Sequence, residues 1–201
     1  MSSSVETATT FPAIPGDAMV LGLVGTPMGP FGAVFTGRGL ACLTFPADAQ
    51  EGCEAWINTR EPGAHVVRDH PALAALSVEL TAYFEGSLHQ FSFPLDLRGT
   101  PFQLDVWQAL GEIPYGEVRS YTDIANSIGR PRAIRAVGMA NHDNPVPIVV
   151  PCHRVIGSNR SLTGYGGGLD LKERLLQLEG VRLNLKISDA PIRMETGSSL
   201  L

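Results

Sequence analysis

Residues 144–155 read NPVPIVVPCHRV, a stretch that sets Cys152 between a proline and a histidine at the end of an apolar run. The proline fixes one backbone dihedral and removes a donor, so the turn that holds the cysteine is expected to be stiff. His153 is titratable and Arg154 carries a permanent charge, and positive surroundings stabilise the thiolate, which is the nucleophilic form. Buried structural cysteines are also common, so the stretch alone leaves two interpretations of Cys152 open, a nucleophile or a core residue.

The segment that leads into this stretch carries two helix-start signals. Thr100 is predicted to be an N-cap, with Pro101 in the first turn and Gln103 completing a capping box. Ser120 with Asp123 gives the second cap signal. The apolar residues expected to face inward are Phe102, Val106 and Leu110 in the first helix, and Ile124, Ala125 and Ile128 in the second.

The second helix is interrupted by residues 129–132 (GRPR) and is predicted to resume over Ala133–Asn141, with Ile134 and Val137 on one side. Two helices separated by a short Gly-containing break have the outline of a helix-turn-helix. A plain corner between two helices has the same pattern, so the spacing leaves both interpretations open.

A last helix is predicted from Asp170 and Glu173 to Glu179, where Gly180 ends it. Its clustered apolar residues are Leu171, Leu175, Leu176 and Leu178. A carboxylate at the C-terminal end of a helix opposes the helix dipole. Glu179 is therefore expected to have a partner elsewhere in the fold, although an exposed surface glutamate would give the same sequence.

The N-terminal half predicts a small domain of strands and helices. Turn signals separate three candidate strands, Met19–Val24, Phe31–Thr36 and Leu40–Phe45. Helices are expected near Ala47–Asn58 and Pro71–Glu85, and Phe91–Leu97 is a candidate for one further strand. In the helix near residues 71–85 the positions at helical spacing are Leu73, Leu76, Leu80 and Phe84.

The predicted fold class is α+β, with a mainly helical C-terminal domain that follows the N-terminal one. The expected divisions are a disordered tail at 1–18, an N-terminal domain at 19–96, a C-terminal domain at 97–184 and a tail at 185–201.

Composition narrows the class of protein. The 201 residues carry a net charge of −5, which argues mildly against binding to nucleic acid. Residues 119–160 are locally positive, with arginines at 119, 130, 132, 135, 154 and 160 against only Asp123 and Asp143. These arginines could form a local basic face that binds nucleic acid, or they could be ordinary arginines on a solvated surface.

Three scattered cysteines favour a reducing compartment, and we expect a cytoplasmic protein with no secretory signal and no membrane span. The histidines and cysteines of the N-terminal half, Cys42, Cys53, His65 and His70, have no recognisable ligand spacing, so no metal is expected.

The segment from Gly99 to Gly180 resembles the catalytic domain of the O6-alkylguanine-DNA alkyltransferases (methylated-DNA–protein-cysteine methyltransferases). The matching pieces, in the family's order and spacing, are FQLDVW at 102–107, IPYGEV at 113–118, SY at 120–121, RAVG at 135–138, residues 144–155, and GYGGG at 164–168. Gly166 departs from the family pattern, because some members have a serine there.

The resemblance implies a reaction for these residues. Cys152 would be the nucleophile, His153 the base acting through a bridging water, and Glu179 the group that orients the histidine. A direct bond between the adjacent Cys152 and His153 side chains is not expected. Tyr121 would donate a hydrogen bond toward the leaving guanine, although a core tyrosine with a satisfied hydroxyl would look the same.

The resemblance also implies DNA recognition through the minor groove, with the target nucleotide flipped out of the duplex. Arg135 would fill the vacated space, although an exposed helix arginine is the plain alternative. The other predicted DNA contacts are Ala136, Gly138, Arg130, Arg132 and Tyr121. The predicted base pocket comprises Val155, Tyr165, Gly166, Asn144 and Pro147. Ordinary turn chemistry would also explain Asn144 before a proline, and a phosphate-binding loop is disfavoured for the glycines because no P-loop lysine accompanies them.

The expected function is DNA repair by irreversible, single-turnover transfer of a methyl or small alkyl group from guanine O6, with thymine O4 as a further candidate, to Cys152. No cofactor is expected, and alkylated double-stranded DNA is the expected partner of a monomer. The alternatives are a lesion sensor, a thiol hydrolase and a transcription regulator. Relatives of the sensor kind lack the cysteine, a hydrolase would turn over many times, and a regulator would need a dimer or a second module.

Overall fold

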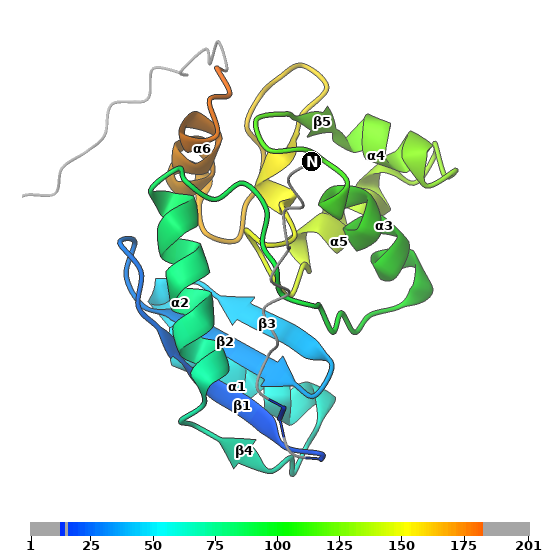
Figure 1. Ribbon diagram of the computed structural model, residues 1–201. Helices are drawn as coiled ribbons and strands as arrows, with labels where there is room; N and C mark the ends of the chain where they lie inside the picture. Colours follow the sequence, from blue (N-terminus) through cyan, green and yellow to red (C-terminus); the bar gives the residue numbers. More distant parts are fainter. Residues whose placement is uncertain (1–12, 15, 183–201) are drawn as a thin grey trace, which may run out of the picture.

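The computed structural model describes residues 13–14 and 16–182. The predicted tail at 185–201 and most of the tail predicted at 1–18 lie outside the described residues. The described chain forms an N-terminal part built on a sheet and a mainly helical C-terminal part (Figure 1). The predicted α+β class is confirmed.

The N-terminal sheet has four strands in the order β3-β2-β1-β4. β1 (Met19–Val24) pairs antiparallel with β2 (Phe31–Thr36), and β2 pairs antiparallel with β3 (Gly39–Thr44). The first two strands have their predicted bounds, and the third begins and ends one residue earlier than predicted. β4 (Val66–Val67) pairs parallel with β1 and was not predicted, because two residues are too short to show a period.

The two N-terminal helices cover opposite faces of this sheet. α1 (Ala49–Arg60), preceded by a 3-10 turn at Pro46–Asp48, packs with the β1 residues Met19 and Leu21. α2 (Pro71–Phe84) packs with the alternate residue Val20. Successive side chains of a strand point to opposite faces, so each face of β1 packs against one of the two helices, which lie on opposite sides of the sheet (Figure 1). The face of α2 that is fully buried is Leu76, Leu80 and Tyr83, whereas Leu73 and Phe84 are only partly buried.

The candidate strand at Phe91–Leu97 is wrong. Only Leu95 makes a β-bridge, to Leu40, supported by backbone bonds from Leu40 N to Pro94 O and from Asp96 N to Leu40 O, both 2.9 Å. Pro94 has no N–H to donate, so the pairing cannot extend into a ladder. The segment instead crosses from the N-terminal part to the C-terminal part.

The C-terminal part contains four helices and a two-stranded parallel sheet. The helices are α3 (Pro101–Gly111), α4 (Tyr121–Ser127), α5 (Ile134–His142) and α6 (Leu169–Leu178). The strands are β5 (Arg119–Ser120) and β6 (Val155–Ile156). Both predicted capping boxes are present, at Thr100 with Gln103 and at Ser120 with Asp123.

The break between α4 and α5 has the predicted position, but one inward residue is wrong. Val137 is fully buried, whereas Ile134 is 40% exposed. Ile134 is the first residue of α5, so its side chain lies at the outer corner of the break rather than under the helix pair. An exposed apolar residue at this corner leaves the first turn of α5 available for contact with a partner.

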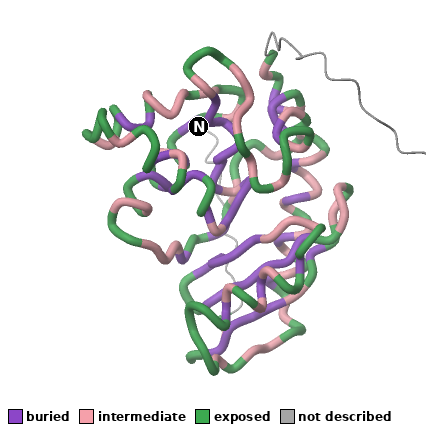
Figure 2. Tube along the Cα trace, turned by 180° about the vertical axis from the view of Figure 1, so that it is seen from behind, coloured by how far each residue is buried: buried purple, intermediate pink, exposed green. Residues whose placement is uncertain are grey.

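One hydrophobic core runs through both parts. It includes Phe31 and Leu80 from the N-terminal part and Trp107, Val137 and Leu175 from the C-terminal part. Figure 2 shows buried residues both along the strands and at the centre of the helical part. No helix within the described residues is both long enough and apolar enough to cross a bilayer.

Candidate active site

Cys152 begins a 3-10 turn, Cys152–Arg154, that follows Pro151 directly. The cysteine is 4% exposed and the adjacent His153 is fully buried. Burial raises the pKa of the Cys152 thiol, while contact with the Asn144 side chain and the positive charge of Lys172 act in the opposite direction. The raised pKa favours the protonated thiol, so a base is needed to form the thiolate.

The turn before the cysteine is held by Asn144. Its Nδ2 donates to Val150 O at 2.8 Å, and its Oδ1 accepts from Val146 N at 3.1 Å. Within this turn Ile148 has a φ of +74°, a conformation that a β-branched residue adopts only under constraint from its surroundings. Pro147 is buried and bridges to Val150. The side chain of Asn144 thus fixes the backbone that presents the thiol.

His153 is oriented by Glu179. Its Nε2 lies 2.8 Å from Glu179 Oε1, and a carboxylate with a low pKa only accepts hydrogen bonds, so the proton of the neutral imidazole is on Nε2. The Nδ1 atom is buried and has no hydrogen-bond partner among the residues that the structure describes. As expected, the side chains of Cys152 and His153 are not bonded directly. Burial lowers the pKa of His153 and the bond to Glu179 raises it, with burial the larger effect.

Glu179 lies one residue beyond the end of α6, as its C-cap, and is buried rather than exposed. Arg154 forms a bidentate pair with it, from Nε at 2.8 Å and Nη2 at 2.9 Å, and Gly116 N donates at 3.3 Å. Burial would raise the pKa of Glu179, but the hydrogen bonds from His153 and Arg154 outweigh it and hold the pKa at about 2. The partners of this carboxylate are thus His153 and Arg154, so it is not a surface glutamate.

Sequence reasoning missed Lys172, which is fully buried. Its Nζ donates to Val155 O at 2.6 Å and to Thr163 O at 2.9 Å, neither of them a carboxylate. Burial lowers the pKa of Lys172 to about 8. A signal was available, because residues 172, 175, 176 and 179 have the i, i+3, i+4, i+7 spacing of a buried helix face.

Sequence reasoning also missed Tyr83, which reaches the site from α2 of the N-terminal part. Its hydroxyl donates to Glu179 Oε1 at 2.6 Å and lies 3.3 Å from His153 Nε2. Its helix position beside Leu80 and Leu76 predicts a core residue, and nothing in the sequence names the distant carboxylate as its partner.

The glycine-rich loop packs against this site through Tyr165. The ring centroid of Tyr165 lies 6.5 Å from that of His153 and 5.5 Å from that of Phe45, a residue of the N-terminal part. Its hydroxyl is buried and has no hydrogen-bond partner within residues 13–14 and 16–182, and burial raises the pKa of Tyr165. Gly166 is exposed, and a Cβ there would meet Phe45 at 3.6 Å, an ordinary contact.

Some of the residues predicted to contact DNA are exposed, and others contact neighbouring residues of the protein. Tyr121 begins α4, its hydroxyl accepts from Thr163 Oγ1 at 3.2 Å, and Gly138 of α5 lies against its ring. Arg135 and Ala136 are exposed on α5. Arg130 is instead engaged within the protein, 3.5 Å from Asp105 and over the ring of Phe102. Arg132 is exposed in the break between α4 and α5.

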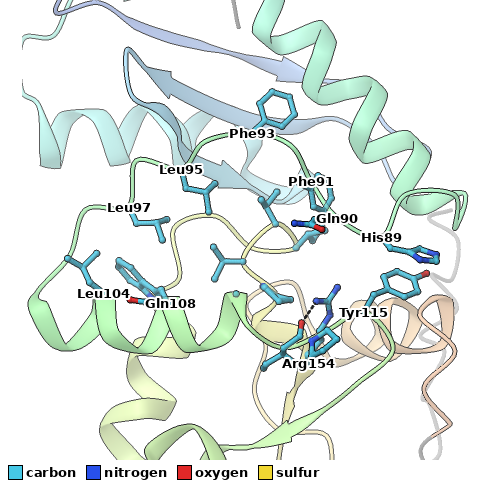
Figure 3. Close-up of a pocket in the computed structure, with 18 residues that line it drawn as sticks. His89, Gln90, Phe91, Phe93, Leu95, Leu97, Leu104, Gln108, Tyr115 and Arg154 are labelled. Atoms are coloured by element: carbon cyan, nitrogen blue, oxygen red, sulfur yellow. Dashed lines mark hydrogen bonds between the residues drawn. The ribbon is translucent and has the colours of Figure 1, made fainter. Parts of the chain in front are cut away.

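A groove of about 860 Å³ lies beside the site but does not contain the thiol. Figure 3 shows the crossing segment on one side and α3 on the other, with Leu95, Leu97 and Leu104 directed into the space between them. Arg154 lines the groove and donates to Ile113 O at 2.6 Å, whereas Cys152 and His153 are not among the lining residues. No group of three or more His, Cys, Asp or Glu side chains suited to a metal occurs in the described part of the chain.

Two family models match this chain. Residues 19–97 match the 6-O-methylguanine DNA methyltransferase, ribonuclease-like domain, and residues 101–181 match the 6-O-methylguanine DNA methyltransferase, DNA binding domain.

Individual relatives agree with these models. The inducible methylated-DNA–protein-cysteine methyltransferase of Bacillus subtilis is 55% identical over 124 residues, which are 62% of this chain and 69% of that protein. The methylated-DNA–protein-cysteine methyltransferase of Methanosarcina barkeri is 45% identical over 170 residues, 80% of this chain and 97% of that protein. Among solved structures, the Mycobacterium tuberculosis OGT in complex with DNA is similar with a TM-score of 0.67 and 44% identity, over 80% of this chain and 92% of that one.

Proposed function

We propose, on the premise that this chain belongs to the 6-O-methylguanine DNA methyltransferase family, that Cys152 receives an alkyl group from guanine O6 in DNA. The chain is a DNA repair enzyme that transfers an alkyl group directly from DNA to a protein cysteine, and DNA is its partner. The observation that carries the assignment of Cys152 is its place beside a histidine whose Nε2 is fixed by Glu179 and whose Nδ1 accepts from no donor in the described part of the chain.

The proposed reaction begins with the loss of the thiol proton. A water between Cys152 and His153 passes that proton to Nδ1, and the ionised Glu179 stabilises the imidazolium that forms. The thiolate attacks the alkyl carbon, so that a sulfur–carbon bond forms as the carbon–O6 bond breaks. The hydroxyl of Tyr121 donates toward the departing guanine, which leaves as a neutral base when it gains a proton from this hydroxyl. The proton that His153 took from the thiol then replaces the one lost by Tyr121, so that no net proton is needed.

The enzyme is proposed to act once and without a cofactor. The product on Cys152 is a thioether, which has no acidic proton and cannot return to a thiolate. The proposed reaction includes no step in which water cleaves the sulfur–carbon bond. Each protein molecule therefore accepts one alkyl group and is then inactive. The size of alkyl group accepted, and activity toward thymine O4, depend on the base pocket.

The proposed DNA-binding surface is the exposed side of α4 and α5, which would bind in the minor groove of a duplex. Arg135 is exposed, so its side chain is free to occupy the space left when the alkylated nucleotide is flipped out. Ala136 beside it and Gly138 next to Tyr121 are small residues that let the DNA backbone approach. Arg130 and Arg132 add positive charge at the start of α5, although Arg130 must first exchange its contact with Asp105 for one with phosphate.

The proposed base pocket lies between the turn fixed by Asn144 and Pro147 and the glycine-rich loop. The main chain of Cys152 and Val155 and of the loop at Tyr165 and Gly166 would read the guanine edge. Val155 O already accepts from Lys172, which fixes its direction and leaves its second lone pair for the base.

The proposed domain divisions are 19–96 and 97–184, with the boundary near the end of the crossing segment. We further propose that the protein acts as a monomer in the cytoplasm, where a reducing environment keeps Cys152 as a thiol.

Intact-mass analysis after mixing the protein with an oligonucleotide that contains one O6-methylguanine tests the assignment of Cys152. The expected result is a gain of about 14 Da, because a methyl replaces the thiol hydrogen, mapped to Cys152 and ending at one equivalent. Cys152→Ala should bind the oligonucleotide and gain nothing, while the control Cys42→Ala should react like the parent chain.

Methyl transfer by Cys152→Ala would contradict the assignment. Tight, lesion-selective binding of the parent chain without any mass change would indicate a lesion sensor instead. Continued product formation beyond one equivalent would indicate a hydrolase.

A further inference from the structure

Tyr83 lies in the N-terminal part, where α2 packs on the sheet, yet its hydroxyl ends inside the candidate active site. It is fully buried and donates to Glu179 Oε1 at 2.6 Å. The same hydroxyl lies 3.3 Å from Nε2 of His153. The site of the C-terminal part is therefore completed by a side chain from the other part of the molecule.

Three donors meet at the single oxygen Oε1 of Glu179. His153 Nε2 lies at 2.8 Å, Arg154 Nη2 at 2.9 Å and Tyr83 Oη at 2.6 Å. A carboxylate oxygen has two lone pairs in the carboxylate plane, so donors around it restrict both the rotation of the carboxylate and the approach of the imidazole. Removing one donor loosens the carboxylate, so that it still accepts from Nε2 but no longer holds the imidazole in a single orientation.

We propose that Tyr83 is a positioning residue of the alkyl-transfer site, whose hydroxyl holds Glu179 so that His153 keeps its proton on Nε2 and its Nδ1 free. This inference rests on the proposed function, because Nδ1 matters only if it takes the thiol proton. It assigns a part in the reaction to the N-terminal part of the chain, which its sequence alone did not disclose.

The hydroxyl of Tyr83 is a permanent donor at this place. Burial raises the pKa of Tyr83 far above its usual value, and the negative charge of Glu179 raises it further. The phenol therefore stays protonated throughout the working range of pH. Its ring is held independently of the hydroxyl, with centroids 5.4 Å from Phe91 and 5.6 Å from Phe84. A phenylalanine at position 83 would keep this packing and lose only the donor.

The groups that act on the charge of His153 are the carboxylate of Glu179 and the cations of Arg154 and Lys172, with the hydroxyls of Tyr83 and Tyr165 beside them. Donation by Tyr83 withdraws negative charge from the oxygen that faces Nε2. Loss of this donor leaves that oxygen more basic, which makes His153 easier to protonate. The acid limb of the pH–rate profile should therefore move to higher pH.

The test compares single-turnover methyl transfer at saturating O6-methylguanine DNA by the full chain and by Tyr83→Phe between about pH 5 and 9. We expect Tyr83→Phe to react about tenfold more slowly, as for the loss of one hydrogen bond to a charged group, with its acid limb at higher pH. Its affinity for DNA should stay within about twofold of that of the parent chain, because Tyr83 is fully buried and remote from the DNA surface.

Tyr115→Phe is the matched control. The hydroxyl of Tyr115 donates to Leu178 O at 3.1 Å, one residue before Glu179, and makes no hydrogen bond to His153 or to the carboxylate, while its ring packs against that of Tyr83 and would be kept by phenylalanine. Its loss should leave both the rate and the pH profile unchanged. A Tyr83→Phe variant with the parent rate and the parent pH profile would overturn the inference while leaving the proposed function intact.

A second measurement separates this inference from the proposed function. The nitrogen chemical shifts of His153 in the free protein report which ring nitrogen carries the proton, whether or not alkyl transfer occurs. We expect Nε2–H in the parent chain, and in Tyr83→Phe either a mixture of tautomers or a higher pKa for His153. Identical signals in both proteins would refute the positioning role, even if the parent chain failed to transfer a methyl group.

If Tyr83→Phe did not fold, 3-fluorotyrosine at position 83 would provide the test, since fluorine makes the phenol a stronger donor without changing the packing. The acid limb should then move to lower pH. A profile equal to that of the parent chain would count against the inference.

Discussion

Glu179 and the groups around it show how a residue in an unfavourable local position becomes stable in the fold. A carboxylate at the C-terminal end of α6 opposes the helix dipole, but four residues donate to it, and its pKa is held at about 2. The same contacts fix the histidine beside Cys152. At the residue scale, the local cost at the helix end is offset by the bonds that build the site.

The depressed pKa of Glu179 predicts a loss of stability in acid. A group whose folded pKa lies below its unfolded value stabilises the fold above the unfolded pKa, and that stabilisation is lost as pH falls through the folded pKa. The window for Glu179 runs from about pH 4.5 down to about pH 2, and the full effect is about 3 kcal/mol.

We expect Glu179→Gln to be less stable than the parent chain at pH 7 by a comparable amount, and to lose less stability over this acid window. Urea midpoints measured at a series of pH values would check this. Glu112→Gln is the matched control, because Glu112 is also a C-cap residue, of α3, but is exposed. Equal pH dependence of the two variants would contradict the prediction.

The break between α4 and α5 is the element that determines how the exposed arginines are presented. Both helices are short, and their packing rests on Ile124, Ala125 and Val137. Ile134, predicted to point inward, is exposed at the start of α5, next to Arg135. An apolar side chain beside a free cation suits a surface that enters a DNA groove better than one that faces only water.

Arg135→Ala should slow alkyl transfer about tenfold or more while weakening DNA binding only severalfold, because the side chain is proposed to occupy the space of the flipped nucleotide. The two effects are separated by measuring DNA affinity and the single-turnover rate at saturating DNA. Arg60→Ala removes the same charge from the exposed end of α1 and serves as the control. If the loss of DNA affinity fully explained the loss of activity, Arg135 would act only as a phosphate contact, and its proposed role in base flipping would be wrong.

Across the whole molecule, the two parts are joined at the site rather than only through the crossing segment. Tyr83 reaches Glu179, Phe45 packs on Tyr165, and Leu43 N donates to Pro145 O at 2.8 Å. These contacts come from α2, from β3 and from the residue after β3. The N-terminal part therefore supports the turn before the cysteine, the glycine-rich loop and the histidine–glutamate pair.

Phe45→Ala tests this support at the glycine-rich loop. Phe45 is half-buried and packs on Phe31 as well as on Tyr165, so its truncation should cost about 2 kcal/mol of unfolding free energy. We also expect transfer to slow severalfold, because Tyr165 loses its packing partner. Urea unfolding and the single-turnover rate are the measurements. The control Trp56→Ala removes another half-buried aromatic, on α1 at the opposite face of the sheet, and should affect stability alone.

The sequence by itself determined most of the local elements and singled out the candidate nucleophile. Capping residues set the starts of α3 and α4, and short apolar runs between turn signals set β1 and β2. Residues 144–155 marked Cys152 and His153. These signals are local, because caps, periods and turns act within a few residues of the chain. Two predictions from local patterns were wrong. Phe91–Leu97 is not a strand, because Pro94 stops the pairing, and Ile134 does not point inward.

Only the tertiary structure decided what lies around the thiol. The resemblance implied His153 as the partner of Glu179, but Arg154 and Tyr83 were added only by the packing of α6 and α2 around the turn at Cys152–Arg154, and the Tyr83–Glu179 bond joins residues 96 positions apart. Lys172 lay on a recognisable buried helix face, but its acceptors are two backbone carbonyls that no local pattern marks. Hydrogen bonds between distant residues depend on how the elements pack, and packing depends on the summed burial of both parts of the chain rather than on any short pattern.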